Sequence, residues 1–394
     1  MVERTALIIN AGHPAQLPVG AALRGAAAIT SASARLDLRV LQPVTSTFPT
    51  YSQGYAAARA SRTFRYRVTF DFDCADVSFK FGHWCVPGGR PSGVITIKAA
   101  LEVHGQLRPM TFIGAPSATL APHATIMTDV LAVSLPAGTA AQIRVWASGA
   151  HPRGKLCVDA AAGDVAHGGR TSTSYEAGYH PIAIFATPRV QGASIVGVGD
   201  SVSEAASDEF VGWVGRVGTL LGISTQRSAK GGIGTGDWLD QSLEGGWHYR
   251  DTLAGATHAT VHLGSNELAF NGTSATSVIA NLTLIYRELL ARGIVPIGAT
   301  MLPRTGGDGS TPPTEAAGAY GPGSSSSRAA INAWIREGGS GLQAAYVATD
   351  FAVETGLDTN VWKAGMTEDG LHPTPAGHQA MALAAQAVIA PLIA

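Results

Sequence analysis

Residues 194–201 read Ser-Ile-Val-Gly-Val-Gly-Asp-Ser, a short apolar run that stops at an acidic and a hydroxyl side chain. This run has the length and composition of a buried strand. Beyond it, apolar side chains recur at helical spacing: Phe210, Val214, Val217 and Leu221. Gly222 then predicts the end of that helix. A strand that turns directly into a helix would present the hydroxyl of Ser201 above the carboxyl edge of a sheet.

The same alternation of strand and helix continues to the end of the chain. Apolar runs predict strands at 257–263, 295–301 and 345–351, and helical spacing predicts a helix over 278–289. Thr374 is placed to cap a last helix, with Pro375 in its first turn, where a missing N–H costs nothing. This pattern predicts an α/β domain with a parallel sheet covered by helices on both faces.

The first half of the chain has period two instead. Apolar and polar side chains alternate from Phe64 to Phe72 and again from Val77 to Phe81, so we expect two strands that pair as a hairpin. Further alternating runs follow near 95–103, 131–135 and 143–145, and no helical stretch occurs between about 60 and 190. Such strands predict an antiparallel β-sandwich, of jelly-roll type. We expect residues 1–190 to form this accessory domain, with a glycan-binding or assembly role, and residues 191–394 to form the α/β domain.

Bulk composition excludes several classes of function. The 394 residues are 45% apolar and 14% charged, with a formal net charge of -1, as in a foldable protein without a basic surface. We therefore expect no nucleic-acid partner and no membrane insertion. The oligomeric state is left open. The histidines are scattered and the three cysteines lie far apart, so we expect no metal and no cofactor.

The first twenty residues lack the basic segment and the long apolar core of a secretory signal. No stretch approaches the roughly 20 apolar residues of a membrane span. The chain is therefore expected to be cytoplasmic, or exported by another route, or trimmed of its leader. Cys74 and Cys85 could meet across neighbouring strands, but buried thiols are the favoured interpretation for them and for Cys157.

Ser201 needs a base to become a nucleophile, and that base needs an orienting group. Asp369 and His372 lie three residues apart in a short segment before the last helix, so the carboxylate can accept the Nδ1 hydrogen of the imidazole. These three side chains form a candidate catalytic triad. His378 lies inside the last helix and is a poor candidate for the base.

Acyl transfer also needs donors for the oxyanion of its tetrahedral intermediate. The glycine-rich segment 230–236 contains Gly234, whose backbone can approach a ligand closely. The segment could equally be an ordinary turn or a phosphate cradle, although no Gly-Lys-Ser/Thr sequence follows it. Asn266 comes directly after a predicted strand, so its amide can reach over the same sheet edge. Ser201 N–H, Gly234 N–H and the Asn266 side chain are the candidate donors.

From about 193 to 394 the chain resembles the SGNH (GDSL-type) hydrolases. Gly199-Asp200-Ser201 matches their nucleophile block, although Val202 and Ser203 follow where many members have Leu and a small residue. Gly234 matches the glycine block, with Gly232 as the alternative alignment. The Gly-x-Asn-Asp block corresponds to residues 264–267, with Glu in place of Asp, and the Asp-x-x-His block is complete at 369–372.

This resemblance implies a flavodoxin-like α/β/α fold and ester hydrolysis. It implies that Ser201 attacks the ester carbonyl, that His372 moves the proton and that Asp369 orients it. Ser201, Gly234 and Asn266 would form the oxyanion hole. Family members with an attached β-sandwich include carbohydrate acetyl esterases, so the implied substrate is a small ester or an acetylated carbohydrate.

Three functions remain open at this point. A short-chain esterase or carbohydrate O-deacetylase is favoured over a lipase or phospholipase, because the segment 303–327 is too polar and glycine-rich for an apolar lid, whether it is functional or a plain insertion. The third is a glycan-binding or structural protein with a vestigial hydrolase domain. Trp84 and Trp146 could stack on sugars, but core packing is favoured for both. Trp238 could wall the acyl pocket or lie in the core.

Overall fold

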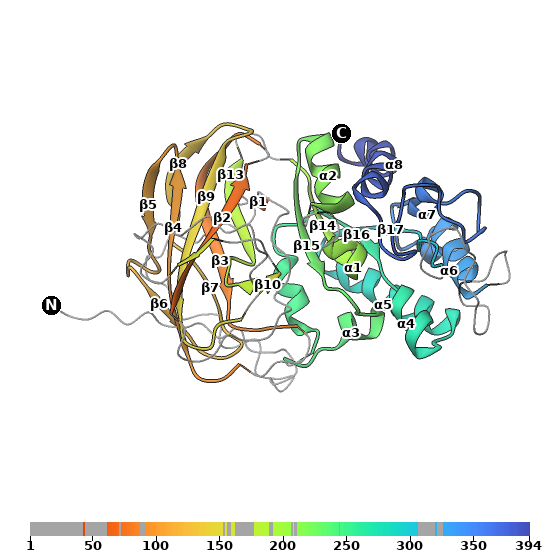
Figure 1. Ribbon diagram of the computed structural model, residues 1–394, viewed down its shortest axis with the longest axis horizontal. Coiled ribbons are helices and arrows are strands. Elements are labelled where there is room, and N and C mark those ends of the chain that lie inside the picture. The colour runs from red at the N-terminus through yellow and green to blue at the C-terminus, as the bar shows by residue number, and fades with distance from the viewer. Residues whose placement is uncertain are drawn as a thin grey trace.

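A computed structural model of the chain describes residues 42–43, 61–70, 72–86, 91–152, 154–155, 159–161, 177–188, 192–205, 208, 211–243, 245–305, 320 and 326–394. Cys157, Phe210 and most of the segment 303–327, on which predictions were made, lie outside these residues. An all-antiparallel part and a parallel α/β part follow each other along the chain (Figure 1).

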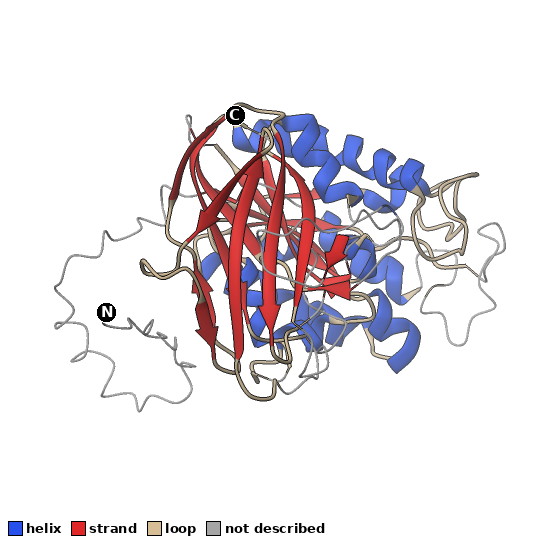
Figure 2. Cartoon of the chain, turned by 60° about the vertical axis from the view of Figure 1, so that its left-hand side comes forward, coloured by secondary structure: helices blue, strands red, loops and turns tan. Residues whose placement is uncertain are grey.

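The first part is a sandwich of two antiparallel sheets, as predicted (Figure 2). One sheet has the order β11 (Asp159–Ala161), β2 (Arg62–Thr69), β9 (Ala140–Ser148), β4 (Ile95–Val103) and β5 (Gln106–Met110), with β6 (Ala118–Leu120) also on β4. The other has the order β1 (Gln42–Pro43), β13 (Ala183–Pro188), β3 (Cys74–Gly82) and β7 (Thr125–Met127), with β8 (Leu131–Leu135) also on β3. A separate pair joins β10 (Gly154–Lys155) to β12 (Ala177–Gly178).

The predicted hairpin between the first two long strands is wrong. β2 pairs with β9 and β11, whereas β3 pairs with β13, β7 and β8, so the two strands belong to different sheets. Phe70 stays beside the start of β9, because its N–H donates to Thr139 O at 3.0 Å and its own carbonyl accepts from Gly138 N at 2.8 Å. The chain therefore crosses from one sheet to the other after Phe70. Period two reports which side chains are buried, not which strand is the neighbour.

The second part is a five-stranded parallel sheet with the order β15 (Ser224–Ala229), β14 (Ser194–Gly199), β16 (His258–His262), β17 (Val295–Ala299) and β18 (Ala345–Val347). This is the flavodoxin-like order, in which the first strand of the α/β domain, β14, lies second in the sheet. The helices are α1 (Ser201–Glu204), α2 (Gly212–Leu221), α3 (Thr235–Leu239), α4 (Ser265–Asn271), α5 (Ala275–Ala291), α6 (Ser327–Arg336), α7 (Thr349–Val353) and α8 (Pro375–Ile393). The 3-10 helices η3 (Trp247–Thr252) and η4 (Gly339–Gly341) complete the part that is described.

Helices cover both faces of this sheet (Figure 1). On one face α2 and α8 bury a cluster that includes Ile195 and Ile297 from the strands. On the other face α5 packs Leu282 and Ile285 into a cluster with Val196 of β14. The predicted α/β/α architecture is therefore confirmed.

Helix ends follow the local signals in the sequence. Gly222 ends α2 at a φ of 64°, in the left-handed region that favours glycine. Thr374 caps α8 by accepting a hydrogen bond from Gly377 N, and Pro375 occupies the first turn. The strand predicted over 345–351 is shorter than expected, because β18 ends at Val347 and α7 begins at Thr349.

Within the parallel sheet, β15 is the strand that the sequence patterns did not predict. Its residues are Ser-Thr-Gln-Arg-Ser-Ala, with no apolar run, yet each of them is buried. The strand pairs with β14, and η3 and β1 lie beside it. Polar side chains are tolerated here because several of them find partners, as when Ser228 Oγ donates to Tyr249 O at 2.8 Å.

The sandwich and the α/β part meet through aromatic and charged side chains. The rings of Trp84 and His248 stack with centroids 4.8 Å apart, and His123 Nδ1 lies 3.1 Å from His248 Nε2. Lys80 Nζ donates to the carbonyl oxygen of Asp251 at 2.8 Å. Trp84 is 0% exposed, so it packs in the core and offers no face to a sugar.

α8 differs from the expectation that no stretch of the chain is long and apolar enough to span a membrane. Among the described residues it is the helix long and apolar enough, by length and composition alone, to cross a membrane, with a mean hydropathy of 1.3. One side of it is buried against the sheet domain, through Met381, Ala385 and Ile389. A core helix passes the same test of length and composition, so this is weak evidence for a membrane span.

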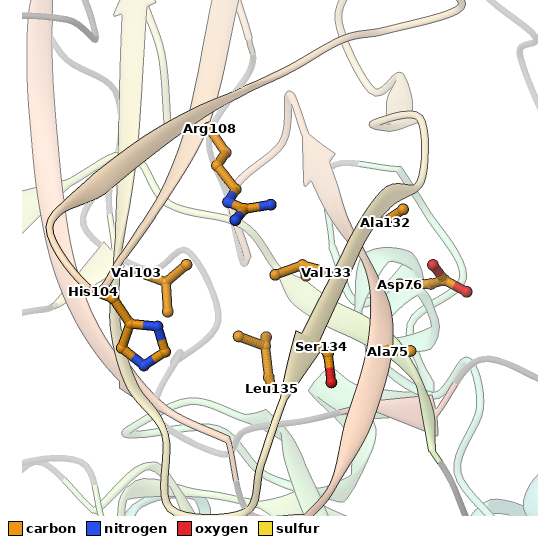
Figure 3. Close-up of a pocket in the computed structure, with 9 residues that line it drawn as sticks. All are labelled: Ala75, Asp76, Val103, His104, Arg108, Ala132, Val133, Ser134 and Leu135. Atoms are coloured by element: carbon orange, nitrogen blue, oxygen red, sulfur yellow. The ribbon is translucent and has the colours of Figure 1, made fainter.

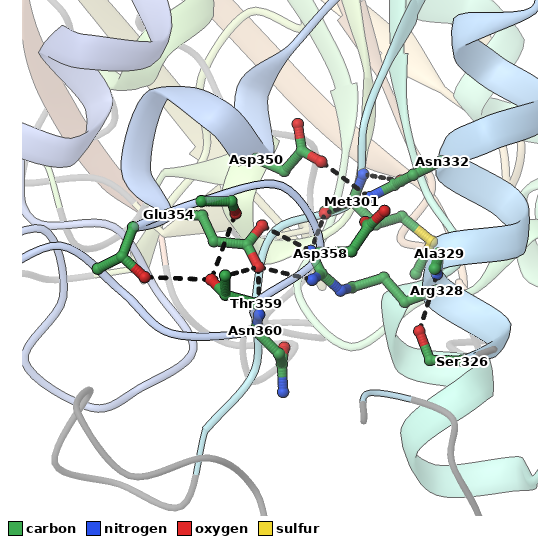
Figure 4. A network of polar contacts seen from close by, with 12 residues as sticks. Met301, Ser326, Arg328, Ala329, Asn332, Asp350, Glu354, Asp358, Thr359 and Asn360 are labelled. Carbon is green, nitrogen blue, oxygen red and sulfur yellow. Dashed lines mark hydrogen bonds and ion pairs between the residues drawn. The ribbon is translucent and has the colours of Figure 1, made fainter. Parts of the chain in front are cut away.

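A buried ionic network ties the last third of the chain together (Figure 4). Arg328 of α6 and Glu354 are both 0% exposed at their side chains, and Arg328 Nη2 lies 2.8 Å from Glu354 Oε1. Glu354 also accepts hydrogen bonds from Thr359 Oγ1 and from Asn360 N. Arg328 Nη1 reaches back to the carbonyl of Met301, directly after β17. The pair thus joins α6, the segment after α7 and the end of β17.

We expect Glu354→Gln to lower the free energy of unfolding by about 3–5 kcal/mol, because it leaves the buried Arg328 charge without its counterion. Urea denaturation followed by circular dichroism measures this. Arg292→Gln, at the exposed C-cap of α5, is the matched control and should change stability by less than about 0.5 kcal/mol. Equal urea midpoints for Glu354→Gln and the wild type would contradict the assigned role.

Candidate active site

Ser201 occupies the turn between β14 and α1. Asp200 precedes it as the N-cap of α1, and its carboxylate accepts the Val202 N–H at 3.0 Å. Gly199 ends the strand where no larger residue fits, because a Cβ there would lie 2.1 Å from Ser203 Oγ. The described residues offer no acceptor to the Ser201 N–H, which leaves that donor available at the sheet edge.

His372 brings its imidazole to the Ser201 hydroxyl from a tight loop that precedes α8. His372 Nε2 lies 2.9 Å from Ser201 Oγ, and His372 Nδ1 lies 2.6 Å from Asp369 Oδ2. With its hydrogen on Nδ1 donated to the carboxylate, the imidazole presents the Nε2 lone pair to the serine O–H. The three side chains named from the sequence therefore meet in one hydrogen-bonded row.

The loop also positions the Asp369 carboxylate that accepts the imidazole hydrogen. Asp369 Oδ1 accepts the backbone N–H groups of Leu371 and His372, at 2.8 and 2.7 Å. Partial burial raises the pKa of Asp369, but these bonds and the bond from the imidazole outweigh it and hold the pKa below the ordinary value of 3.8. The carboxylate is half exposed, so its field is screened and its main effect is orientation.

Two further hydrogen bonds fix this loop to neighbouring segments of the chain. Gly370 O accepts from Thr305 N at 2.9 Å and from Trp362 Nε1 at 3.2 Å. Arg304, next to Thr305, exchanges backbone hydrogen bonds with the Asn360 side chain, at 2.9 and 3.0 Å. Because Asn360 N is bound to Glu354, the buried network of Figure 4 continues to the loop that carries His372.

The predicted oxyanion donors are arranged unequally. Asn266 lies in the first turn of α4 and donates one Nδ2 hydrogen to Ile233 O at 3.1 Å, which leaves its second hydrogen for another acceptor. The Gly234 N–H already has a partner, because it donates to Asp237 Oδ2 at 2.8 Å in the first turn of α3. One N–H cannot fully serve two acceptors, so Gly234 can bind an oxyanion only when Asp237 moves. Gly232, the alternative, has a φ of 86°.

Glu267, which stands where Asp was expected, connects these two blocks. Its carboxylate accepts from Thr235 N at 2.9 Å and from Thr235 Oγ1 at 2.6 Å. Burial raises the pKa of Glu267 above its ordinary value, although the bonds from Thr235 oppose the rise. A Cβ on Gly234 would lie 2.4 Å from Glu267 Oε2, so a larger residue there would displace the Glu267 carboxylate.

The sequence did not predict the residues that bind Glu267 and hold the start of α3. Asn281 Nδ2 donates to Thr235 Oγ1 at 2.8 Å, so α5 also holds the start of α3. Neither Thr235 nor Asn281 is one of the motif residues that pointed to the site, so the sequence did not indicate either residue. A hydroxyl one residue after Gly234 is the signal that could have pointed to this contact.

The remaining candidates lie elsewhere. His378 is buried within α8, and burial lowers its pKa to about 4. The imidazole bonded to Ser201 Oγ is that of His372. Trp238 is 0% exposed and donates from Nε1 to Ser228 Oγ at 3.1 Å, which makes it a core residue. Trp146 is partly exposed on β9, with the Lys98 ammonium 5.2 Å from its ring centroid.

The described residues contain no group of three or more His, Cys, Asp or Glu side chains that could hold a metal ion. Cys74 and Cys85 are both buried, and no disulfide bond joins them. A hollow of about 550 Å³ lies in the sandwich, away from Ser201 (Figure 3). It is lined by Ala75, Asp76, Val103, His104, Arg108, Ala132, Val133, Ser134 and Leu135, a set without Phe, Tyr or Trp.

Comparison with known proteins identifies the second half of the chain. Residues 197–380 match the model of the GDSL-like lipase/acylhydrolase family. No curated protein shows significant similarity to the chain.

Among solved structures, one similar protein comes from Desulfitobacterium hafniense DCB-2 and is described as a lipolytic protein of the G-D-S-L family. It is 17% identical, with a TM-score of 0.39, and the match covers 50% of this chain and 98% of that chain. A GDSL-like lipase from Bacteroides thetaiotaomicron VPI-5482 is 18% identical, with a TM-score of 0.38 over 50% and 86% of the two chains. A family two carbohydrate esterase from Clostridium thermocellum, in complex with cellohexaose, is 12% identical, with a TM-score of 0.38 over 88% and 97%.

At these scores the likenesses carry no conclusion about substrate. The family model does identify the chemistry in general terms, because its span includes both Ser201 and His372. Residues 197–380 of this chain form a GDSL-like lipase/acylhydrolase domain.

Proposed function

We propose that this chain is a serine ester hydrolase in which Ser201, His372 and Asp369 act as a catalytic triad. The observation that carries the proposal is the row of two hydrogen bonds, 2.9 Å from Ser201 Oγ to His372 Nε2 and 2.6 Å from His372 Nδ1 to Asp369 Oδ2. A serine hydroxyl is a weak nucleophile alone, and an imidazole with its Nδ1 hydrogen engaged can accept its proton.

The reaction follows from this row. Ser201 Oγ attacks the ester carbonyl while its proton passes to His372 Nε2, and the carbonyl oxygen becomes an oxyanion. His372 then protonates the leaving alkoxide, and an acyl-serine remains. Water attacks this acyl group with His372 as base, which releases the carboxylic acid and restores Ser201.

Two donors available in the structure would stabilise the oxyanion: Ser201 N and the second hydrogen of Asn266 Nδ2. Gly234 N would join them once Asp237 releases it. Each donor aimed at the developing charge lowers the barrier without reorganisation, which is typically the largest catalytic term.

The substrate we propose is a short-chain, acetyl-type ester, with an O-acetylated carbohydrate as its source. The polar and glycine-rich composition of 303–327 disfavours a lipase or phospholipase, since such enzymes use apolar lids. The intact hydrogen-bonded row disfavours a vestigial hydrolase domain on a glycan-binding protein. For the N-terminal domain predicted over residues 1–190, we propose an accessory role in glycan binding or assembly.

Ser201→Ala should abolish hydrolysis of p-nitrophenyl esters, and the wild type should prefer acetate along a series from acetyl to dodecanoyl. The variant removes the attacking oxygen but leaves the fold intact. Ser277→Ala on the exposed side of α5 is the matched control and should retain full activity. Turnover by Ser201→Ala equal to that of the wild type would refute the nucleophile.

The oxyanion donors can be tested by a pair of variants. Asn266→Ala should lower kcat by roughly 10²–10³, because it removes a donor to the transition state. Asp237→Ala frees the Gly234 hydrogen and should not lower kcat if Gly234 is also a donor. Asn271→Ala, at the exposed end of α4, is the control. A wild-type kcat in Asn266→Ala would show that Asn266 is not an oxyanion donor. A hundredfold loss of kcat in Asp237→Ala would show the same for Gly234.

The pH dependence should reflect the lowered pKa of Asp369. Since its hydrogen bonds hold the pKa of Asp369 below 3.8, protonation of Asp369 should not contribute to the acidic limb of kcat/KM above that pH. The Asp369 bonds should stabilise the fold down to about pH 3.8 and lose that effect as the pH falls through the lower, folded-state pKa. An ionisation between about pH 4 and 5 in the kcat/KM profile that disappears in Asp369→Asn would contradict the lowered pKa of Asp369.

A further inference from the structure

Arg304 lies at the same sheet edge as Ser201 but plays no part in the proposed triad. It follows β17, and both its backbone polar groups are bound by the Asn360 side chain. The next residue, Thr305, donates its N–H to Gly370 O in the loop that carries His372. The backbone of Arg304 is thus held firmly, one residue from a direct contact with the catalytic loop.

The Arg304 guanidinium is held between two aromatic rings. Its Cζ lies 4.6 Å from the ring centroid of Phe270 and 5.9 Å from that of Tyr320. No hydrogen bond or ion pair joins this guanidinium to any residue that the structure describes, and its Nη1 is buried without a partner. A charged donor group in this position is costly unless an acceptor arrives to pair with it.

Both rings belong to the surroundings of the nucleophile. Phe270 lies one turn after Asn266 on α4. Tyr320 Oη lies 2.6 Å from Ser265 Oγ, beside Asn266. Burial raises the pKa of Tyr320, and Asp200, the residue before Ser201, contributes to the rise while Arg304 opposes it. Arg304 therefore stands at the rim of the candidate active site, between α4 and the His372 loop.

Phe270 supplies the second half of a subsite. Its side chain is among the most exposed large apolar side chains of the described residues, with 69% of the residue surface accessible. An exposed ring offers a flat apolar face on which the C–H face of a sugar ring can pack. A guanidinium beside that ring presents planar paired donors, which match a carboxylate in two parallel hydrogen bonds.

We propose that Phe270 and Arg304 form a subsite for an acidic sugar unit of the ester substrate, with the sugar ring on Phe270 and its carboxylate on Arg304. This inference rests on the proposed esterase function and narrows its substrate to O-acetylated glycans that contain uronate residues. A neutral acetylated glycan can use the apolar face of Phe270 but leaves Arg304 unpaired. A sulfated sugar shares the anionic chemistry but lacks the planar acceptor.

The test compares kcat/KM for acetate release from O-acetylated oligogalacturonate with that from O-acetylated xylo-oligosaccharide. The wild type should favour the acidic substrate by roughly 10- to 100-fold, the value of a charge-assisted bond of about 1.5–3 kcal/mol. Arg304→Gln should bring this ratio close to one, and Arg304→Lys should restore part of it. Arg292→Gln, on the exposed end of α5, is the matched control and should keep the full ratio.

A binding measurement supports the kinetic one. Calorimetric titration of the Ser201→Ala protein with trigalacturonate should show binding that Arg304→Gln weakens at least tenfold, with galactotriose and a sulfated galactose trimer as the neutral and sulfated arms. Phe270→Ala removes an exposed ring, so it should leave the fold intact, and it should weaken binding of both the acidic and the neutral trimer.

The results that would contradict the esterase function differ from those that would contradict the subsite. No hydrolysis of p-nitrophenyl acetate by the wild type would overturn the proposed function itself. Hydrolysis of that ester together with equal kcat/KM for the acidic and neutral glycans would overturn the subsite alone. A ratio that survives in Arg304→Gln would do the same, and stronger binding of the sulfated trimer than of trigalacturonate would overturn the assignment to uronate.

Discussion

The contact between Ser201 Oγ and His372 Nε2 joins two residues that are 171 positions apart in the chain, and most of the α/β domain serves to make it at 2.9 Å. Ser201 reaches the sheet edge because β14 ends at Gly199 and Asp200 caps the following turn. His372 reaches the same edge because Gly370 is bonded to the segment after β17. A parallel sheet brings these strand ends to one edge, where small shifts in any of them would separate the pair.

Three carboxylates hold this edge, and their burial differs with their task. Glu354 is fully buried with Arg328 and joins secondary-structure elements. Glu267 is buried against Thr235 and fixes the start of α3 to α4. Asp369 is half exposed, and backbone N–H groups hold it ionised next to His372. The buried two determine where the loops lie, and the exposed one sets the orientation of a single imidazole.

Local signals predicted much of this arrangement. The strand before Ser201 and the cap at Thr374 depend on neighbouring residues only, so they could be recognised in the sequence. Features that depend on distant partners were missed or wrong: the sheet assignment of β2 and β3, and the burial of the polar strand β15. The capture of the Gly234 N–H by Asp237 and the position of Arg304 between two rings also follow only from packing, because no motif records which side chain arrives nearest.

The most direct test of the central claim is covalent trapping of the nucleophile. The folded protein is treated with a p-nitrophenyl alkylphosphonate, and intact mass and peptide mapping locate the adduct. The account predicts one phosphonyl group per chain, on the peptide that contains Ser201, and at least a hundredfold slower labelling in His372→Ala. Labelling at another serine, or labelling of Ser201 at the same rate without His372, would contradict it.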